Sequence, residues 1–155
     1  MEKAFNLYGK AVLFEKSAAT SGPSRRIAGI ISTEQRDRQQ EIIVQKGLDF
    51  DPFLTWGWLN DNHSKATDAV VGYPSSVQQF QKGDTLPNGE VAKYPCTWME
   101  GYLLEGTPRA DGIWELGQAL SKADGPRSLG FSIEGTIVKR SGPGKMTVAK
   151  AVVQN

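Results

Sequence analysis

The chain has 155 residues, of which 39% are hydrophobic and 23% charged, a composition that suits one globular domain and is cramped for two. Its net charge of +1, with no long run of Lys or Arg, argues against nucleic acid as a partner. One His and one Cys exclude an internal disulfide and the usual zinc ligand sets, and no apolar run approaches the ~20 residues of a membrane span. We therefore predict a soluble intracellular protein with no metal, no other cofactor and no membrane attachment.

The first third of the chain predicts strands joined by polar segments. Residues 4–14 predict a strand that enters a sheet, and residues 17–24 have the small residues of a flexible link. Residues 25–32 predict a second strand, and residues 41–45 predict a short buried one, because three β-branched side chains follow one another there. The polar turn between these two strands predicts a hairpin.

An aromatic segment and a polar loop follow. Residues 49–59 predict a short helix or an aromatic-lined loop. Residues 60–68 are almost entirely polar, so they predict an exposed loop that carries His63, the sole histidine. Core packing is the expected use of Trp56, Trp58 and Trp98, whereas an exposed cluster of these rings would suit a ligand-binding module.

The second half predicts further strands and one long helix. These strands are expected at residues 69–80, 97–105 and 146–153. Asp111 is the candidate N-cap of a helix that residues 124–126 end. The pattern predicts a single α+β domain over residues 1–155, mainly β, with a partly closed β-barrel of about six or seven strands flanked by helices. An apolar strand so close to Asn155 also predicts a truncated or processed chain.

Residues 127–138 predict the strand that carries the candidate catalytic side chains. By period 2, Phe131 and Ile133 fall on one face while Ser132 and Glu134 fall on the other, so a hydroxyl and a carboxylate share the polar face. The predicted helix precedes this strand, whereas the nucleophile elbow of α/β-hydrolases needs a strand before its serine and a helix after it. That elbow is excluded, but a serine on a strand is still a candidate nucleophile if a base reaches it.

His63 is the side chain suited to be that base, because an imidazole accepts and returns a proton near neutral pH. Glu134 is a candidate third member, and the alternative is a surface carboxylate, since side chains at i and i+2 lie ~7 Å apart along a strand. Asp61 and Asp68 are alternative groups to orient the ring. Cys96 with His63 is a rival pair, but Cys96 enters an apolar strand and is predicted to be buried and inert.

Motifs along the chain resemble the prohead maturation proteases of tailed bacteriophages. In order they are the Asp37-Arg38 turn before Ile42-Ile43, Phe53-Leu54 and Gly57 before the Asn62-His63 loop, and Trp114-Glu115-Leu116-Gly117 before the Gly-x-Ser-x-x-Gly strand from Gly130 to Gly135. The resemblance runs from Arg26 to the C-terminus. It implies that His63 and Ser132 match the family's loop histidine and strand serine.

The family implies a serine endopeptidase with a fold similar to the herpesvirus assemblins, a β-barrel surrounded by helices. It implies assembly inside the phage procapsid in the host cytoplasm, with scaffold protein, capsid-protein extensions and the protease itself as substrates, and we expect a homo-oligomer. Herpesvirus relatives use a second histidine as third member, which this chain lacks, so Glu134 or a residue beyond Asn155 would take that role.

Backbone N–H groups near Arg127, Ser128 and Gly130 are the expected oxyanion and substrate region. The alternative function is a catalytically inactive scaffold or capsid-assembly domain that keeps the protease fold and acts by binding.

Overall fold

The computed structural model describes residues 4–9, 12–16, 22–123, 127–142, 144 and 147–154. Within these residues the chain is mainly β with two α-helices, which confirms the predicted α+β class. Residues 17–21 of the predicted link and the predicted helix stop at residues 124–126 lie outside the described residues.

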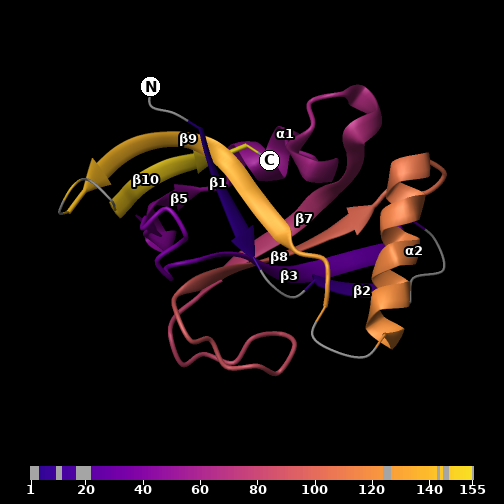
Figure 1. Cartoon of the computed structure of the whole chain (residues 1–155), viewed down its shortest axis with the longest axis horizontal. Coiled ribbons are helices and arrows are strands. Elements are labelled where there is room, and N and C mark those ends of the chain that lie inside the picture. The colour runs from indigo at the N-terminus through magenta and orange to yellow at the C-terminus, as the bar shows by residue number, and fades with distance from the viewer. Residues whose placement is uncertain are drawn as a thin grey trace.

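Ten strands form two five-stranded sheets in the described part of the chain. The first sheet has the order β1-β9-β10-β4, with β5 also paired to β10, and the second has the order β2-β3-β8-β7-β6. The strands are β1 (Ala4–Gly9), β2 (Val12–Lys16), β3 (Arg25–Thr33), β4 (Ile42–Ile43), β5 (Leu48–Asp49), β6 (Leu59–Asn60), β7 (Val70–Phe80), β8 (Cys96–Leu103), β9 (Phe131–Ser141) and β10 (Thr147–Val153). The predicted number of strands, about six or seven, is too low because the predicted strand at residues 4–14 is two strands and because β5 and β6, with two residues each, were not predicted. Figure 1 shows that the first sheet curls, so the arrangement is partly barrel-like.

The predicted hairpin between residues 25–32 and 41–45 is wrong. β3 pairs antiparallel with β2 and β8, whereas β4 pairs parallel with β10 in the other sheet. Side-chain hydrogen bonds, and not a ladder of backbone hydrogen bonds, attach this segment to the second sheet. The buried Gln45 donates to Ser32 Oγ and accepts from Thr97 Oγ1. The predicted single strand at residues 4–14 is likewise two strands, one in each sheet.

The two helices form close to their predicted positions. α1 (Asp51–Trp56) has Pro52 in its first turn and buries Phe53, as expected for the aromatic segment. α2 (Pro108–Lys122) begins earlier than predicted, because Pro108 suits a first helical turn and Thr107 takes the N-cap position. Asp111 is therefore not the N-cap but a residue of the first turn.

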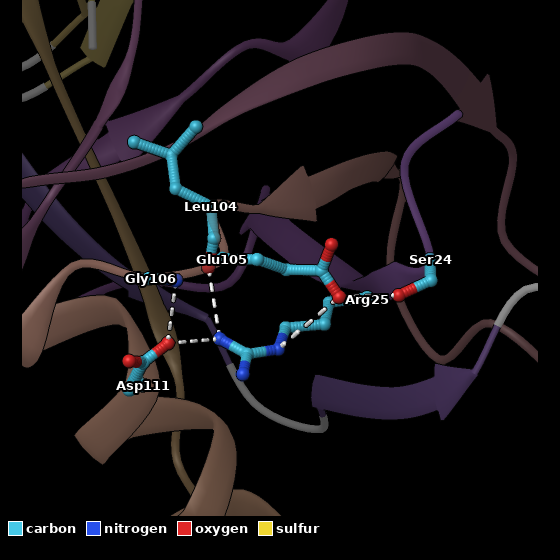
Figure 2. Close-up of polar contacts among 6 residues, drawn as sticks. All are labelled: Ser24, Arg25, Leu104, Glu105, Gly106 and Asp111. Carbon is cyan, nitrogen blue, oxygen red and sulfur yellow. Dashed lines mark hydrogen bonds and ion pairs between the residues drawn. The ribbon is translucent and has the colours of Figure 1, made fainter. Parts of the chain in front are cut away.

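Arg25 ties the start of β3 to the turn before α2 (Figure 2). Its Nη1 donates to Asp111 Oδ1 at 2.6 Å and to the Leu104 carbonyl at 2.9 Å. The same carboxylate oxygen accepts the Gly106 backbone N–H at 3.0 Å. The guanidinium also lies 5.7 Å from the centre of the Trp114 ring. This network fixes the N-terminal turn of α2 against the second sheet.

Replacing Asp111 by Asn should lower the stability of the protein near neutral pH and have a smaller effect in acid. The hydrogen bond from Arg25, followed by that from the Gly106 N–H, lowers the pKa of the Asp111 carboxyl. Such a group stabilises the fold above its unfolded-state pKa of about 4, and this stabilisation is lost as the pH falls through the lowered value. Thermal unfolding of both proteins at about pH 7 and about pH 3 measures the difference. A difference that does not shrink in acid would contradict the prediction.

Candidate active site

β9 presents Ser132 and Glu134 on one face and apolar side chains on the other. Ile133 and Ile137 are 2% and 1% exposed in the main core, which confirms the period-2 pattern. Ser132 pairs with Tyr8 of β1, whereas the described pairing with β10 begins only at Gly135. Ser132 therefore lies in the first part of β9, before the residues of β9 that pair with β10.

His63 reaches this face from the loop between β6 and β7. Leu59 of β6 pairs with Gly72 of β7, so the loop starts from the edge of the second sheet. A Cβ atom at Gly72 would lie 2.3 Å from the Tyr102 carbonyl oxygen and 3.2 Å from Leu59 Cδ1. Only glycine therefore allows these strands to approach closely enough to place the loop.

Arg109 of α2 holds the loop. Its guanidinium lies 3.7 Å from Asp61 Oδ2 and 3.8 Å from Asp68 Oδ2. The two carboxylates proposed as alternative orienters of the imidazole thus contact Arg109. The carboxylate that the structure brings to the His63 ring is that of Glu134.

The loop carries unusual backbone conformations at its turn. Asn62 and His63 have φ angles of 51° and 56°, in the left-handed region. Asn and His are among the side chains that adopt this region most often, but each still costs on the order of 1 kcal/mol. Backbone strain of this kind clusters at functional sites.

The imidazole of His63 lies between Ser132 and Glu134. Its Nε2 is 2.7 Å from Ser132 Oγ, and its Nδ1 is 3.7 Å from Glu134 Oε2. The first distance is that of a hydrogen bond, which the hydroxyl donates when the ring proton is on Nδ1. The second is longer than a hydrogen bond, so the carboxylate acts on the ring through its charge. Side chains at i and i+2 of a strand lie ~7 Å apart, which was the argument against Glu134 as third member. The ring of His63 spans this gap between Ser132 and Glu134.

Lys65 also binds the carboxylate of Glu134. Its ammonium pairs with Oε1, the oxygen that does not face His63. The side chain of Glu134 is only 13% exposed, against 32% for His63 and 66% for Lys65. Glu134 is thus not a surface carboxylate, and His63 is more enclosed than the exposed loop predicted.

A cleft of about 640 Å³ opens beside Ser132 and His63. Its walls are residues 59–63, from β6 and the start of the loop that follows it, and residues 128–132. This volume is within the range of small-molecule and peptide side-chain sites. Ser128 and Gly130, predicted for the oxyanion and substrate region, line the cleft, whereas Arg127 is exposed and is not among the residues that line it.

The rival nucleophile lies outside this cleft. Cys96 is 1% exposed and packs with Leu86 and Ala92 in a separate cluster. Burial, aided by the charge of Asp84, raises the pKa of its thiol. A protonated buried thiol is a poor nucleophile, so the prediction of an inert cysteine agrees with its surroundings.

The tryptophans do not form one exposed platform. Trp98 is 2% exposed, as core packing predicted. Trp56 and Trp58 are 79% and 53% exposed, so core packing was the wrong prediction for these two rings. They follow the buried Phe53, and the short α1 has only one fully buried side chain to share with the core.

Lys65 is the contact of this site that sequence reasoning missed. It follows His63 by two positions, as Glu134 follows Ser132 by two positions, so the loop and the strand carry matched pairs of polar side chains. That shared spacing was the available signal. It becomes informative only when the loop is known to lie along the strand.

Neither a metal site nor a membrane helix is found in the described ranges. Among residues 22–123 and the other described segments, no three His, Cys, Asp or Glu side chains gather where they could hold a metal ion. No helix in this part of the chain is long and apolar enough to cross a membrane. Comparison with known protein families, curated proteins and solved structures finds no match to the chain.

Proposed function

We propose that the chain is a serine endopeptidase that works by acyl transfer between Ser132 and His63. The observation that carries this proposal is the 2.7 Å distance between Ser132 Oγ and His63 Nε2, across 69 positions of sequence. A nucleophile in hydrogen-bond contact with its base is the geometric signature of such a site. The adjoining cleft of about 640 Å³ gives a peptide access to the hydroxyl.

The reaction proceeds in two halves. In the first, His63 Nε2 takes the proton from Ser132 Oγ, Oγ bonds to the scissile carbonyl carbon, and His63 returns the proton to the amine as the C–N bond breaks. In the second, His63 takes a proton from a water molecule whose oxygen attacks the acyl carbon. The acid product leaves, and Ser132 recovers its proton from His63.

Glu134 takes the role of third member. When the imidazole gains a proton, the carboxylate 3.7 Å from Nδ1 stabilises the cation and favours the ring orientation that leaves Nε2 toward Ser132. In unliganded enzymes such contacts are often long and shorten when substrate binds. Lys65 pairs with the other carboxylate oxygen, so the carboxylate of Glu134 is held in position beside the ring.

Backbone N–H groups of residues 128–130 are the proposed donors to the oxyanion. Ser128 and Gly130 line the same cleft as Ser132, on the chain segment that leads directly into β9. Preorganised backbone donors of this kind stabilise the negative oxygen of a tetrahedral intermediate.

The motifs that resemble prohead maturation proteases suggest the biological setting. We propose that the enzyme cleaves scaffold protein, extensions of the major capsid protein and itself, as a homo-oligomer with an assemblin-like fold inside the procapsid, which assembles in the host cytoplasm. This setting rests on the order of short motifs around Asp37, His63 and Ser132.

A small fluorophosphonate probe tests the chemistry directly. We expect it to label Ser132, mapped by peptide mass spectrometry, and we expect new termini when the chain is incubated with its co-encoded scaffold or capsid protein. An unlabelled Ser132 in the folded protein would favour the alternative, an assembly domain that binds its partners without cleaving them.

A further inference from the structure

A second, smaller hollow lies next to the cleft. It has a volume of about 170 Å³, and we call it the apolar pocket. Most of its apolar lining is made by Ile27, Leu59, Val71, Leu103, Ile113 and Phe131, and Asn60, Asp61 and Asn62 supply a polar part of the lining. The apolar side chains come from β3, β6, β7, β8, α2 and β9, so the pocket lies between the second sheet, α2 and the start of β9.

The apolar pocket is an unfilled part of a hydrophobic cluster. Ile27, Val71 and Leu103 are 2%, 3% and 4% exposed and form the cluster between the second sheet and α2, with Ile113 and Phe131 packed against it. An engineered apolar cavity of about 150 Å³ binds benzene, so this pocket has room for a side chain the size of Leu, Ile, Met or Phe.

The apolar pocket is continuous with the cleft. The cleft and the apolar pocket share the wall formed by residues 59–62 and 129–131. Ser132 and His63 line the cleft but not the pocket. A peptide whose carbonyl carbon lies at Ser132 Oγ would therefore have a neighbouring side chain at the mouth of the apolar pocket.

The lining selects against charged side chains. An acidic group would lose water in a lining that is mainly apolar, and it would face the Asp61 carboxylate at the shared wall. A basic group would find the same Asp61 already facing Arg109, at 3.7 Å. The favourable occupant is an aliphatic or aromatic side chain, because burying its apolar surface lowers the free energy of binding.

We infer that the apolar pocket is a specificity subsite for a large apolar side chain close to the scissile bond of the peptide substrate. The inference rests on the proposed serine endopeptidase activity. It names the substrate class as peptides with Leu, Ile, Met or Phe at one fixed position near the cleavage site.

Phosphonate probes test the inference separately from the activity. The small fluorophosphonate reports whether Ser132 is reactive at all. A set of tetrapeptidyl phosphonates that carry Leu or Ala at each position in turn then reports the subsite, as the Leu:Ala ratio of labelling rates within one protein. We expect a ratio of about 10 to 100 at one position and near 1 at the others, since burying a few methylene groups discriminates to that extent.

Variants of Ile113 connect the ratio to the apolar pocket. Ile113→Phe should fill the pocket and lower the Leu:Ala ratio at least about tenfold. Ile113→Ala should enlarge it and raise the labelling rate of a Phe probe relative to the Leu probe. Leu116→Phe is the matched control on the same helix, because Leu116 is 48% exposed and outside the pocket, and its ratio should equal that of the unmodified protein.

Each outcome has a definite meaning. A Leu:Ala ratio near 1 at every position, with Ser132 labelled, overturns the subsite and leaves the proposed activity standing. A preference that Ile113→Phe leaves unchanged also overturns it. If Ile113→Phe does not fold, an unchanged Phe:Leu ratio in Ile113→Ala overturns it. Failure of the small fluorophosphonate to label Ser132 refutes the proposed activity, and the subsite falls with it.

Discussion

Replacing Ser132 by Ala should lower peptide hydrolysis by about 10⁴- to 10⁶-fold, and replacing His63 by Ala should have an effect of the same size. The two groups act as one unit, because the serine is a poor nucleophile without the base that accepts its proton. The double variant should therefore be no worse than either single variant. Steady-state cleavage of a quenched peptide, with fluorophosphonate labelling as a second readout, measures the loss.

The fold should survive both substitutions. Ser132 is partly exposed and its backbone pairing with Tyr8 does not depend on the hydroxyl. Ser141→Ala is the matched control, because Ser141 is on the same strand but outside the cleft, and it should keep full activity. Substantial cleavage by the folded Ser132→Ala variant would exclude the assignment of the nucleophile.

Replacing Glu134 by Gln should lower kcat by about 10²- to 10⁴-fold, a smaller loss than at Ser132. The amide has nearly the same shape but no charge, so it no longer stabilises the protonated imidazole or favours its productive orientation. Labelling by the small fluorophosphonate should slow in parallel, since the first proton transfer is affected. The kinetic loss is measured on the purified variant with the quenched peptide.

Glu41→Gln is the matched control for Glu134→Gln. The Glu41 side chain is 15% exposed and pairs with Arg140 of β9 at 2.7 Å, so it resembles Glu134 in burial and in having a cationic partner. Its replacement should change stability but not kcat, because it does not contact the imidazole. Equal activity losses in the two variants would mean that Glu134 acts through the stability of β9 and not on His63.

The apolar pocket and the site would work together in substrate choice. The cleft is lined by residues 59–63, from β6 and the start of the following loop, and by residues 128–132. Most of the same residues line the apolar pocket. Any change that moves this loop would alter reactivity and side-chain preference together. Arg109, which holds Asp61 and Asp68, is well placed to limit such movement, although exposed ion pairs of this kind each contribute less than about 1 kcal/mol.

Much of the site could be predicted from local sequence pattern. The alternation of Phe131, Ser132, Ile133 and Glu134 determined which side chains share a face, because period 2 is a property of any strand. The single histidine determined which residue could serve as base. The long helix was also visible, although its start was misplaced because Asp111 binds Arg25 instead of capping the helix.

Short elements and sheet membership could not be predicted. β6 has two residues, too few for any periodic pattern, yet it positions the loop of His63. The strand at β4 was predicted, but the sheet that it joins, opposite to β3, was not. Strand pairing depends on which edges are free and which side chains pack between the sheets. Gln45 shows this, since its buried amide links its segment to Ser32 and Thr97 by side chains alone.

The sequence by itself determined the chemical groups: a hydroxyl and a carboxylate on one strand face, and one imidazole in a polar loop. Only the tertiary structure decided that Nε2 of His63 lies 2.7 Å from Ser132 Oγ, that the ring spans the gap to Glu134, and that Lys65 takes the remaining carboxylate oxygen. The physical reason is that local pattern fixes the direction of a side chain relative to its own backbone. The distance between two groups 69 residues apart depends on how both sheets, the loop and α2 pack together.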